Sequence, residues 1–210
     1  MIENNIFGPK DWLELYEVSL PWIPDFLWDS EFLNSPCVFY KEKKKKETHF
    51  FFLGINAIGC KPLTIVKWHK IHTRPLHPIW NQPCFSLHNH WCLGLNPEAR
   101  KFIDRTCEFR WYALLLEIPP HSTDRKYNEQ VGMLPIGYEV PTGVEEMTKN
   151  ILYYQKNGAY LNRNRYARVS DTTIFNLQAV IGSDGKKILL CHYWPEECRH
   201  DIGIAASLKV

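Results

Sequence analysis

The chain has 210 residues, of which 45% are hydrophobic and 23% charged, and its formal net charge is +2. This length and apolar content are typical of a chain that buries its own core, and they argue against intrinsic disorder. The mild charge argues against a dedicated nucleic-acid binder, because such surfaces usually carry strong, clustered basicity. We expect a single domain over residues 1–210, in which residues 1–36 pack on a sheet as a helix and a strap.

Cysteine usage and the N-terminus indicate the compartment. The chain has seven cysteines without regular spacing, and an odd number in a chain of this size favours reduced thiols. The N-terminal sequence MIENNIFGPKDW lacks the basic region and apolar run of a signal peptide. No stretch approaches the roughly 20 apolar residues that span a bilayer. We expect a cytoplasmic protein, and export by a route without a signal peptide stays open.

The first predicted element is a short amphipathic helix that begins at Pro9, a residue suited to the first helical position. It places Trp12 and Tyr16 on one face. Residues 20–36 follow and are crowded with aromatic residues, prolines and acids. We interpret this segment as an apolar strap over a sheet face, and a partner-binding surface is the alternative.

Residues 37–68 predict a meander of strands. The basic run 41–46 lies between two apolar runs and is expected to form the solvated tip of a hairpin. Strands are predicted at 37–40, 49–55 and 63–66, with a turn at Gly59. Residues 67–82 show no periodicity and predict a loop.

Two capped helices and a central strand are predicted in the second half. The first helix runs from about Asn96 to Cys107, with an asparagine cap and a proline in its first turn. Residues 109–118 are apolar enough for a central strand. The second helix starts at the capping box Thr142 to Glu145 and stops at Gly158.

The clearest local signal is a β-hairpin over residues 172–194. Two runs rich in β-branched and aromatic residues flank Gly182-Ser183-Asp184-Gly185, which supplies the positive φ angles of a tight turn. The whole pattern predicts the α+β class, with a mostly antiparallel sheet of about six or seven strands and two or three helices packed on one face.

Several short motifs together resemble a known group of proteins. They are Glu47-Thr48-His49-Phe50-Phe51-Phe52, Lys61-Pro62-Leu63-Thr64, Arg125-Lys126-Tyr127 with Gln130, Tyr138-Glu139-Val140-Pro141 and Asp201-Ile202-Gly203-Ile204-Ala205-Ala206. The chain resembles, over about residues 7–210, an uncharacterised bacterial domain of chlamydia-like and other intracellular bacteria. It departs from that pattern at its C-terminus, where Lys209-Val210 replaces a basic-aromatic pair. The resemblance implies no activity, because no function is assigned to that group.

A histidine- and cysteine-rich segment is the first candidate for chemistry. Alternation from Cys84 to Cys92 would place His88, His90 and Cys92 on one face of a strand, where they could bind zinc. However, structural zinc usually uses paired CxxC turns, and neighbours on one strand supply only part of a tetrahedral set. Packing and hydrogen-bonding roles are the alternative. We predict no cofactor apart from zinc at these residues.

Two further thiol arrangements are weaker candidates. Cys191-His192 and Cys198-x-His200 would form a metal site only if they converge, and ordinary strand positions are the alternative. A cysteine nucleophile with a histidine base is a second hypothesis. Against it, some pairing is expected by chance among so many cysteines and histidines, and no family signature surrounds any of them. The sequence contains no GxSxG, GxxxxGK[ST] or GxGxxG motif, which argues against the commonest hydrolase, nucleotidase and dehydrogenase designs.

The polar loop after residue 121 is the preferred binding candidate. If this loop folds over the second capped helix, the Arg125 cation and the Gln130 amide could hold an anionic ligand near the helix N-terminus. The residues of this predicted site are Arg125, Tyr127, Gln130, Glu139 and Glu145. The alternative is an ion pair of Arg125 with Glu145 or Asp124 that pins the loop.

These observations favour a non-catalytic binding or protein-interaction module. The expected partner is another protein or a small anionic ligand, because catalytic signatures are missing and aromatic residues are abundant. A metal- or thiol-dependent enzyme of hydrolase type, which would use the His/Cys-rich strand, is the alternative.

Overall fold

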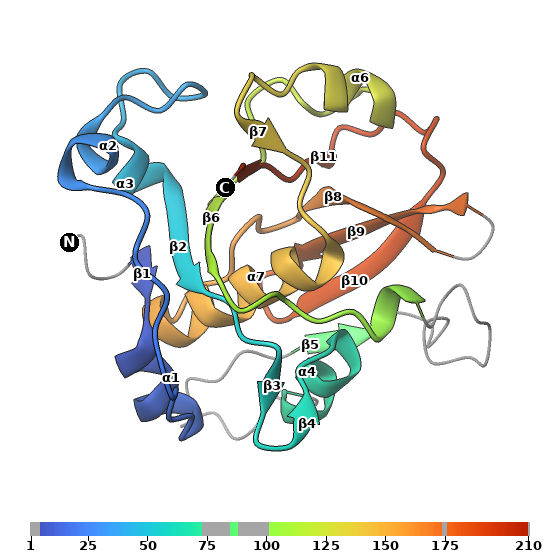
Figure 1. Ribbon diagram of the computed structural model, residues 1–210. Coiled ribbons are helices and arrows are strands. Elements are labelled where there is room, and N and C mark those ends of the chain that lie inside the picture. The colour runs from blue at the N-terminus through green and yellow to red at the C-terminus, as the bar shows by residue number, and fades with distance from the viewer. Residues whose placement is uncertain (1–4, 73–84, 88–100, 174–175, 210) are drawn as a thin grey trace.

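The computed structural model describes residues 5–72, 85–87, 101–173 and 176–209 (Figure 1). Helices and strands both contribute to these residues, so the α+β content predicted from the sequence is confirmed. The strands form two five-stranded sheets and one two-stranded sheet. The central helix α7 lies between the two larger sheets.

The first sheet has the strand order β1-β2-β6-β12-β7. Its strands are β1 (Ile6–Phe7), β2 (His49–Leu53), β6 (Trp111–Leu115), β7 (Tyr138–Glu139) and β12 (Ser207–Leu208). β1 pairs with β2 in parallel, whereas the other pairs are antiparallel. β2 and β6 are buried along their whole length, and the Phe52 ring stacks on Tyr112. The predicted strands at 49–55 and 109–118 therefore form the interior of this sheet.

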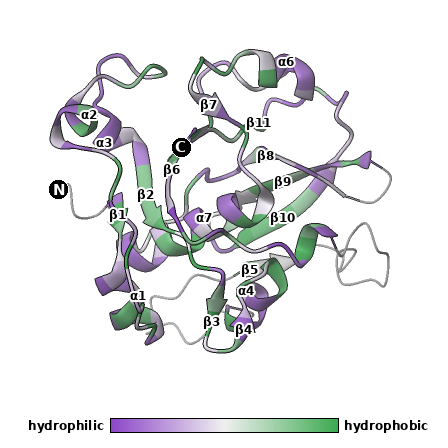
Figure 2. Cartoon of the chain, viewed as in Figure 1, coloured by the Kyte–Doolittle hydropathy of each residue, from purple (hydrophilic) through white to green (hydrophobic). Residues whose placement is uncertain are grey.

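The second sheet has the strand order β11-β8-β9-β10-β5. Its strands are β5 (Phe85–Leu87), β8 (Arg165–Thr172), β9 (Gln178–Ser183), β10 (Ile188–Tyr193) and β11 (Ile202–Ile204). β9 and β10 pair antiparallel around a turn in which Gly185 has φ +80°. The predicted hairpin is therefore confirmed. Figure 2 shows that hydrophobic residues follow these two strands.

The remaining elements are a small hairpin and six helices in the described part of the chain. The hairpin consists of β3 (Ala57–Ile58) and β4 (Lys61–Pro62). The helices are α1 (Pro9–Tyr16), α2 (Ser30–Asn34), α3 (Lys45–Thr48), α4 (Ile65–Ile71), α6 (Tyr127–Gly132) and α7 (Gly143–Asn157). Residues 101–103, within the helix predicted from about Asn96 to Cys107, are also helical, and Phe102 and Ile103 are buried there.

Local signals fix both ends of α7. The Glu145 carboxylate accepts a hydrogen bond from the Thr142 amide at 2.7 Å, and the helix ends at Gly158 with φ +67°. α7 contacts β1 and β2 of the first sheet and β8 and β9 of the second (Figure 1). It is therefore covered on two sides, and its buried residues include polar ones as well as Val144, Met147 and Ile151.

A polar group is buried on α7 because of this double cover. The Lys149 ammonium donates to the Glu146 carboxylate at 2.7 Å and to the Leu115 carbonyl of β6 at 2.9 Å. Asn150 donates to the same carboxylate. Burial raises the pKa of Glu146, and Lys149 and Asn150 oppose that rise. A buried charge is tolerated when it is paired and hydrogen-bonded in this way.

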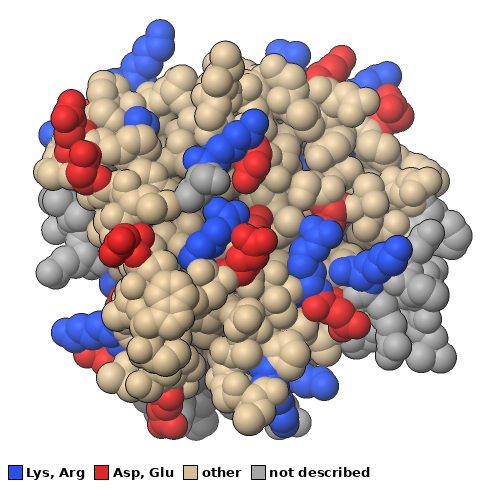
Figure 3. All heavy atoms as spheres, viewed as in Figure 1, with Lys and Arg blue, Asp and Glu red and all other residues tan. Residues whose placement is uncertain are grey.

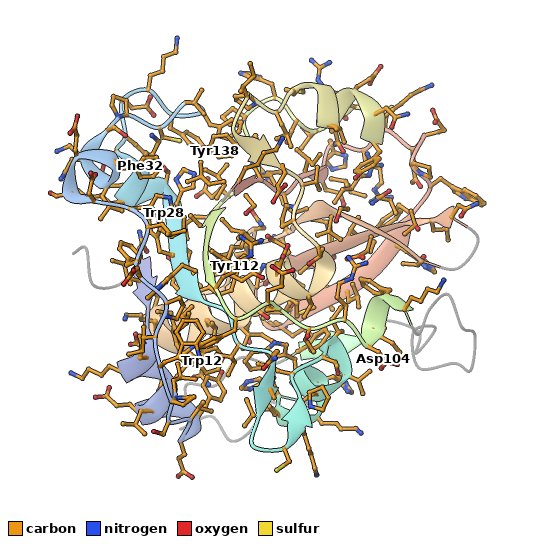
Figure 4. The ribbon with its side chains drawn as sticks, in the orientation of Figure 1. Trp12, Trp28, Phe32, Asp104, Tyr112 and Tyr138 are labelled. Atoms are coloured by element: carbon orange, nitrogen blue, oxygen red, sulfur yellow. The ribbon has the colours of Figure 1, made fainter. Side chains whose placement is uncertain are left out.

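The N-terminal strap packs on the first sheet, as expected. Phe26 and Trp28 make edge contacts with Phe51 of β2. Trp28 lies on the strap side of that sheet in Figure 4. Trp22 and Leu27 remain 59% and 54% exposed. The alternative use of this segment as a partner-binding surface stays a prediction.

The predicted single, mostly antiparallel sheet differs from the structure. Both five-stranded sheets are mixed, because β1 with β2, β5 with β10 and β8 with β11 pair in parallel. Parallel partners are separated by long connections, so no turn signal in the sequence reveals them. The helix α7 also lies between sheets instead of covering one outer face.

Two strand predictions in the first third, at residues 37–40 and 63–66, were wrong, and residues 37–40 form no strand. Residues 63–66 were expected to form a strand, but the Thr64 hydroxyl accepts a hydrogen bond from the Lys67 amide and starts α4. N-terminal capping outweighed the β-branched residues there. The basic run was expected to be a solvated hairpin tip. Residues 41–43 do form an exposed turn, which the antiparallel bridge between Pro36 and Lys44 closes, but the end of the run forms α3, and the Lys45 ammonium lies 3.9 Å from the Phe32 ring centre.

Candidate functional site

The predicted loop site is organised around a buried arginine. Arg168 of β8 is fully buried and donates to the Gln130 side-chain oxygen at 2.9 Å and to the Arg125 carbonyl at 3.0 Å. Its other terminal nitrogen donates to the carbonyls of Trp194 and Glu197. Burial lowers the pKa of Arg168. One guanidinium thus donates to four acceptors, in the 125 loop, in α6 and in the 194–197 loop, which indicates a structural role.

Gln130 belongs to the same network and is not free for a ligand. Its amide nitrogen donates to the Ser122 carbonyl at 2.6 Å and to the Ile202 carbonyl at 3.1 Å. The side chain is fully buried. Gln130 therefore ties α6 to β11.

The other predicted loop residues do not converge on one site. Arg125 is exposed and donates from Nε to the His121 carbonyl, so neither ion pair considered for it is formed among the described residues. Glu139 is exposed in the edge strand β7, and Glu145 lies 4.0 Å from Arg110. The loop packs against β11 and not over the start of α7. Tyr127 differs from the other predicted residues because it lies near enough to Asp171 to be affected by its charge. Burial and the charge of Asp171 raise the pKa of the Tyr127 hydroxyl.

The thiol and metal candidates divide into two groups. His88, His90 and Cys92 lie outside the described residues. Cys191, His192, Cys198 and His200 are described, but no group of three or more His, Cys, Asp or Glu suited to a metal occurs within that part of the chain.

A polar hollow of about 340 Å³ lies where β8 meets the helical segment at residue 101. We call it the Asp171 pocket. It is lined by Lys101, Phe102, Arg105, Ser170, Asp171, Thr172, Thr173 and Asn176. Asp104, labelled in Figure 4, directly precedes Arg105 at this edge of the molecule. The volume is within the range of small-molecule sites.

An irregularity in β8 brings neighbouring side chains to this pocket. The register between β8 and β9 shifts between Arg168 and Thr172. In a regular strand, successive side chains alternate between the two faces. Bulges re-aim side chains and are frequent beside functional sites. Ser170, Asp171 and Thr172, which all line the hollow, lie at this register shift.

Asp171 is the buried floor of the pocket and is held from two sides. One carboxylate oxygen accepts from the Gly143 amide at the start of α7, at 2.6 Å. The other lies 2.8 Å from the Arg105 guanidinium. Burial raises the pKa of Asp171, and the Gly143 amide and Arg105 oppose the rise. The carboxylate thus satisfies the helix terminus and fixes the arginine.

Gly143 is required for this arrangement. A Cβ atom at this position would lie 2.4 Å from a Phe102 ring carbon and 3.4 Å from the Asp171 carboxylate. Such a contact with the ring is too close for a real side chain. The absence of a side chain therefore allows the helix start, the ring and the carboxylate to meet.

The rim of the pocket presents hydrogen-bond donors. Arg105 uses one terminal nitrogen for Asp171, and its other N–H groups have no partner among the described residues. Lys101, one helical turn earlier, is exposed and forms no ion pair within the described ranges. Ser170 and Thr172 add hydroxyl groups. Guanidinium, ammonium and hydroxyl donors in one hollow match the oxygen atoms of a phosphate-type anion.

Two of the described thiols, Cys107 and Cys191, are poor nucleophiles. Burial raises the pKa of Cys107 to about 12 and that of Cys191 to about 11. The thiolate is the reactive form of cysteine, so both groups are inert at neutral pH. All five cysteines within the described ranges are free, as reduced thiols would be.

Two sequence patterns bear on the Asp171 pocket. Lys101 and Arg105 are spaced by four residues on a predicted helix, which places them on one face. The polar run 170–173 interrupts an apolar strand. Neither pattern shows that the two segments meet, because their contact depends on the tertiary fold.

Comparisons add no family to these observations. No family model, curated protein or solved structure matches the chain. Among the described residues, no helix combines the length and apolar character that a membrane span needs. On the face shown in Figure 3, positive and negative side chains are interspersed. The resemblance to the uncharacterised bacterial domain stays a prediction.

Proposed function

We propose that the chain is a non-catalytic binding module and that the Asp171 pocket holds a small phosphate-type anion. The observation that carries this proposal is the ion pair between the buried Asp171 carboxylate and Arg105. It fixes the arginine, while the remaining N–H groups of Arg105 have no partner in the part of the chain that the structure describes. A guanidinium that is already oriented loses less freedom when it binds an anion. Lys101 adds a second positive charge at the rim.

Binding is preferred over catalysis because the pocket offers donors and no free base. Both oxygens of Asp171 are engaged, and a guanidinium does not release its proton in proteins. Thr173 is 3% exposed and its hydroxyl contacts His192 at 3.2 Å, so it is poorly placed to attack a ligand. The alternative is a metal- or thiol-dependent enzyme that uses the His/Cys-rich strand; the raised pKa values of Cys107 and Cys191 argue against these two thiols as its nucleophile.

The proposal is tested by titrating inorganic phosphate into the full chain in a calorimeter at constant ionic strength. Lys101→Ala and Arg105→Gln should each weaken binding about tenfold or more, because charge-assisted hydrogen bonds contribute roughly 1.5–3 kcal/mol. Lys61→Ala removes the same charge from β4, outside the pocket, and should leave the affinity unchanged.

Two results would contradict the proposal. The first is that the wild-type chain does not bind phosphate. The second is that Lys101→Ala and Arg105→Gln bind phosphate as tightly as the Lys61→Ala control. Lys101→Ala should fold normally, because Lys101 is exposed and, unlike Arg105, does not pair with the buried Asp171. A loss of phosphate binding in this variant therefore reports on the pocket and not on folding.

A further inference from the structure

A second hollow, of about 430 Å³, lies at the opposite end of β8 and α7. We call it the arginine pocket. The polar and aromatic residues that line it include Glu117, Tyr153, Tyr160, Asn162, Arg163 and Arg165. Its volume is also within the range of small-molecule sites. It shares no lining residue with the Asp171 pocket.

The backbone conformation of residues 162–165 sets the two arginines in place. Asn162 and Asn164 have left-handed φ angles of +48° and +57°, which asparagine tolerates better than other residues with side chains. The Asn164 amide donates to the Ser183 carbonyl at 2.7 Å, and the Arg165 amide donates to the Asn162 carbonyl at 2.9 Å. The alternation of asparagine and arginine thus builds a tight loop that carries both guanidiniums.

The absence of a side chain at Gly185 leaves room for the Arg163 side chain. A Cβ atom on Gly185 would lie 2.7 Å from Nε of Arg163. The Arg163 side chain therefore lies directly against the turn between β9 and β10. A glycine is needed here for a second reason, because its φ angle is +80°. The hairpin turn thus positions one cation of the pocket.

The charged groups of this pocket are unpaired. Within the described residues, neither Arg163 nor Arg165 forms an ion pair, and Glu117 forms none either. Asn162 is 8% exposed; its oxygen accepts from the Ile118 amide, while its amide nitrogen has no partner in the described part of the chain. A buried donor without a partner is costly, so a ligand acceptor would stabilise it.

The phenol groups act as donors and not as nucleophiles. Burial and the charge of Glu117 raise the pKa of Tyr153. Burial, with a further contribution from Glu117, raises the pKa of nearby Tyr40 to about 12. These hydroxyls stay protonated at neutral pH. The pocket is therefore suited to recognition by charge and hydrogen bonding.

We propose that the arginine pocket binds an acidic amino acid, a zwitterion with two carboxylates and one ammonium group. Two guanidiniums match two carboxylates, each of which can take paired N–H donors. The Glu117 carboxylate matches the ammonium group. The unpartnered Asn162 amide supplies a further donor to a carboxylate oxygen. A dicarboxylate without an ammonium group would place negative charge beside the Glu117 carboxylate, and the repulsion would weaken its binding.

The test compares L-glutamate with glutarate, which has both carboxylates and no ammonium group. Calorimetric titration of the full chain should show that L-glutamate binds at least about tenfold more tightly than glutarate. Arg165→Ala should weaken the binding of both ligands about tenfold. Glu117→Gln should weaken only L-glutamate binding, because only this ligand has a group that pairs with Glu117.

Lys186→Ala is the matched control, since Lys186 is exposed, lies next to Gly185 and does not line the pocket. It should change neither affinity by more than about twofold, a value expected for surface charges. Arg105→Gln should also bind L-glutamate normally, which separates this pocket from the phosphate proposal. The inference is overturned if L-glutamate does not bind, if glutarate binds equally well, or if Glu117→Gln affects both ligands alike.

Discussion

Two buried histidines give the protein a pH-dependent stability at the residue scale. The His49 ring contacts the Tyr138 hydroxyl at 3.0 Å, and the His72 ring contacts the Tyr16 hydroxyl at 3.3 Å. Burial lowers the pKa of each histidine to about 4. Both rings are therefore neutral in the folded chain at pH 6, whereas an unfolded histidine there is mostly protonated.

The free energy of unfolding should fall as the pH drops from about 6.5 to about 4. In this window the unfolded chain binds more protons, so stability is complete above pH 6.5 and is lost toward the folded pKa. The loss is on the order of 3 kcal/mol for each histidine. Urea unfolding at several pH values measures it.

His49→Gln should make that slope shallower, because the glutamine amide does not titrate. The exposed His200→Gln variant should keep the wild-type slope and serves as the control. Equal slopes in wild-type and His49→Gln would contradict the assignment. The dependence of the unfolding free energy on pH reports the titration of His49 even if the glutamine variant is less stable at every pH, because a constant loss of stability does not change the slope.

At the scale of single elements, α4 shows how a cap decides between helix and strand. The segment Leu63-Thr64-Ile65-Val66 has the residues of a strand, and the sequence alone favoured that structure. The Thr64 hydroxyl instead accepts the Lys67 amide at 3.1 Å, and Trp68 of the same helix is fully buried. Tertiary burial of the helix face, with the cap, outweighs the intrinsic preference.

Thr64→Ala should lower the free energy of unfolding by about 1 kcal/mol, because the Lys67 amide loses its acceptor. Thr64→Ser keeps a hydroxyl at this position and should cost much less. Chemical denaturation of both variants measures the difference. If alanine and serine destabilise the chain equally, the cap does not explain α4.

At the scale of the whole molecule, the segment 201–209 joins the two large sheets. β11 pairs with β8 in the second sheet, and β12 pairs with β6 and β7 in the first (Figure 1). Between them, the Ala205 amide donates to the Arg168 carbonyl at 2.9 Å, and the Ala206 carbonyl accepts from the Leu115 amide at 2.8 Å. One short segment therefore bridges both halves of the core.

Ala205→Pro should destabilise the whole fold by roughly 1–3 kcal/mol or more, because it removes the N–H group and leaves the Arg168 carbonyl buried without that donor. Ala205→Gly keeps the N–H group and should cost less. Thermal unfolding should be followed by tryptophan fluorescence and by circular dichroism. Equal midpoints for the proline and glycine variants would show that the hydrogen bond does not couple the sheets.

Local signals made part of this fold predictable from the sequence. The hairpin of β9 and β10, the start of α1 at Pro9 and both ends of α7 follow from residues close together in the chain, because turns and caps are short-range features. The candidate pockets were not predicted. Tyr127, one residue of the predicted loop site, titrates under the influence of Asp171, but Arg105 and Asp171 are far apart in sequence and meet only in the fold.

The sequence by itself determined the mixed class of the protein, its longest described helix and its hairpin, since backbone conformation responds to proline, glycine and capping residues nearby. Only the tertiary structure decided that the strands divide into two mixed sheets around α7, because parallel pairing and burial depend on distant segments. The same reason applies to the pockets: the charge on Arg105, Arg163 or Arg165 is visible in the sequence, whereas its partner, or the lack of one, is a property of the folded chain.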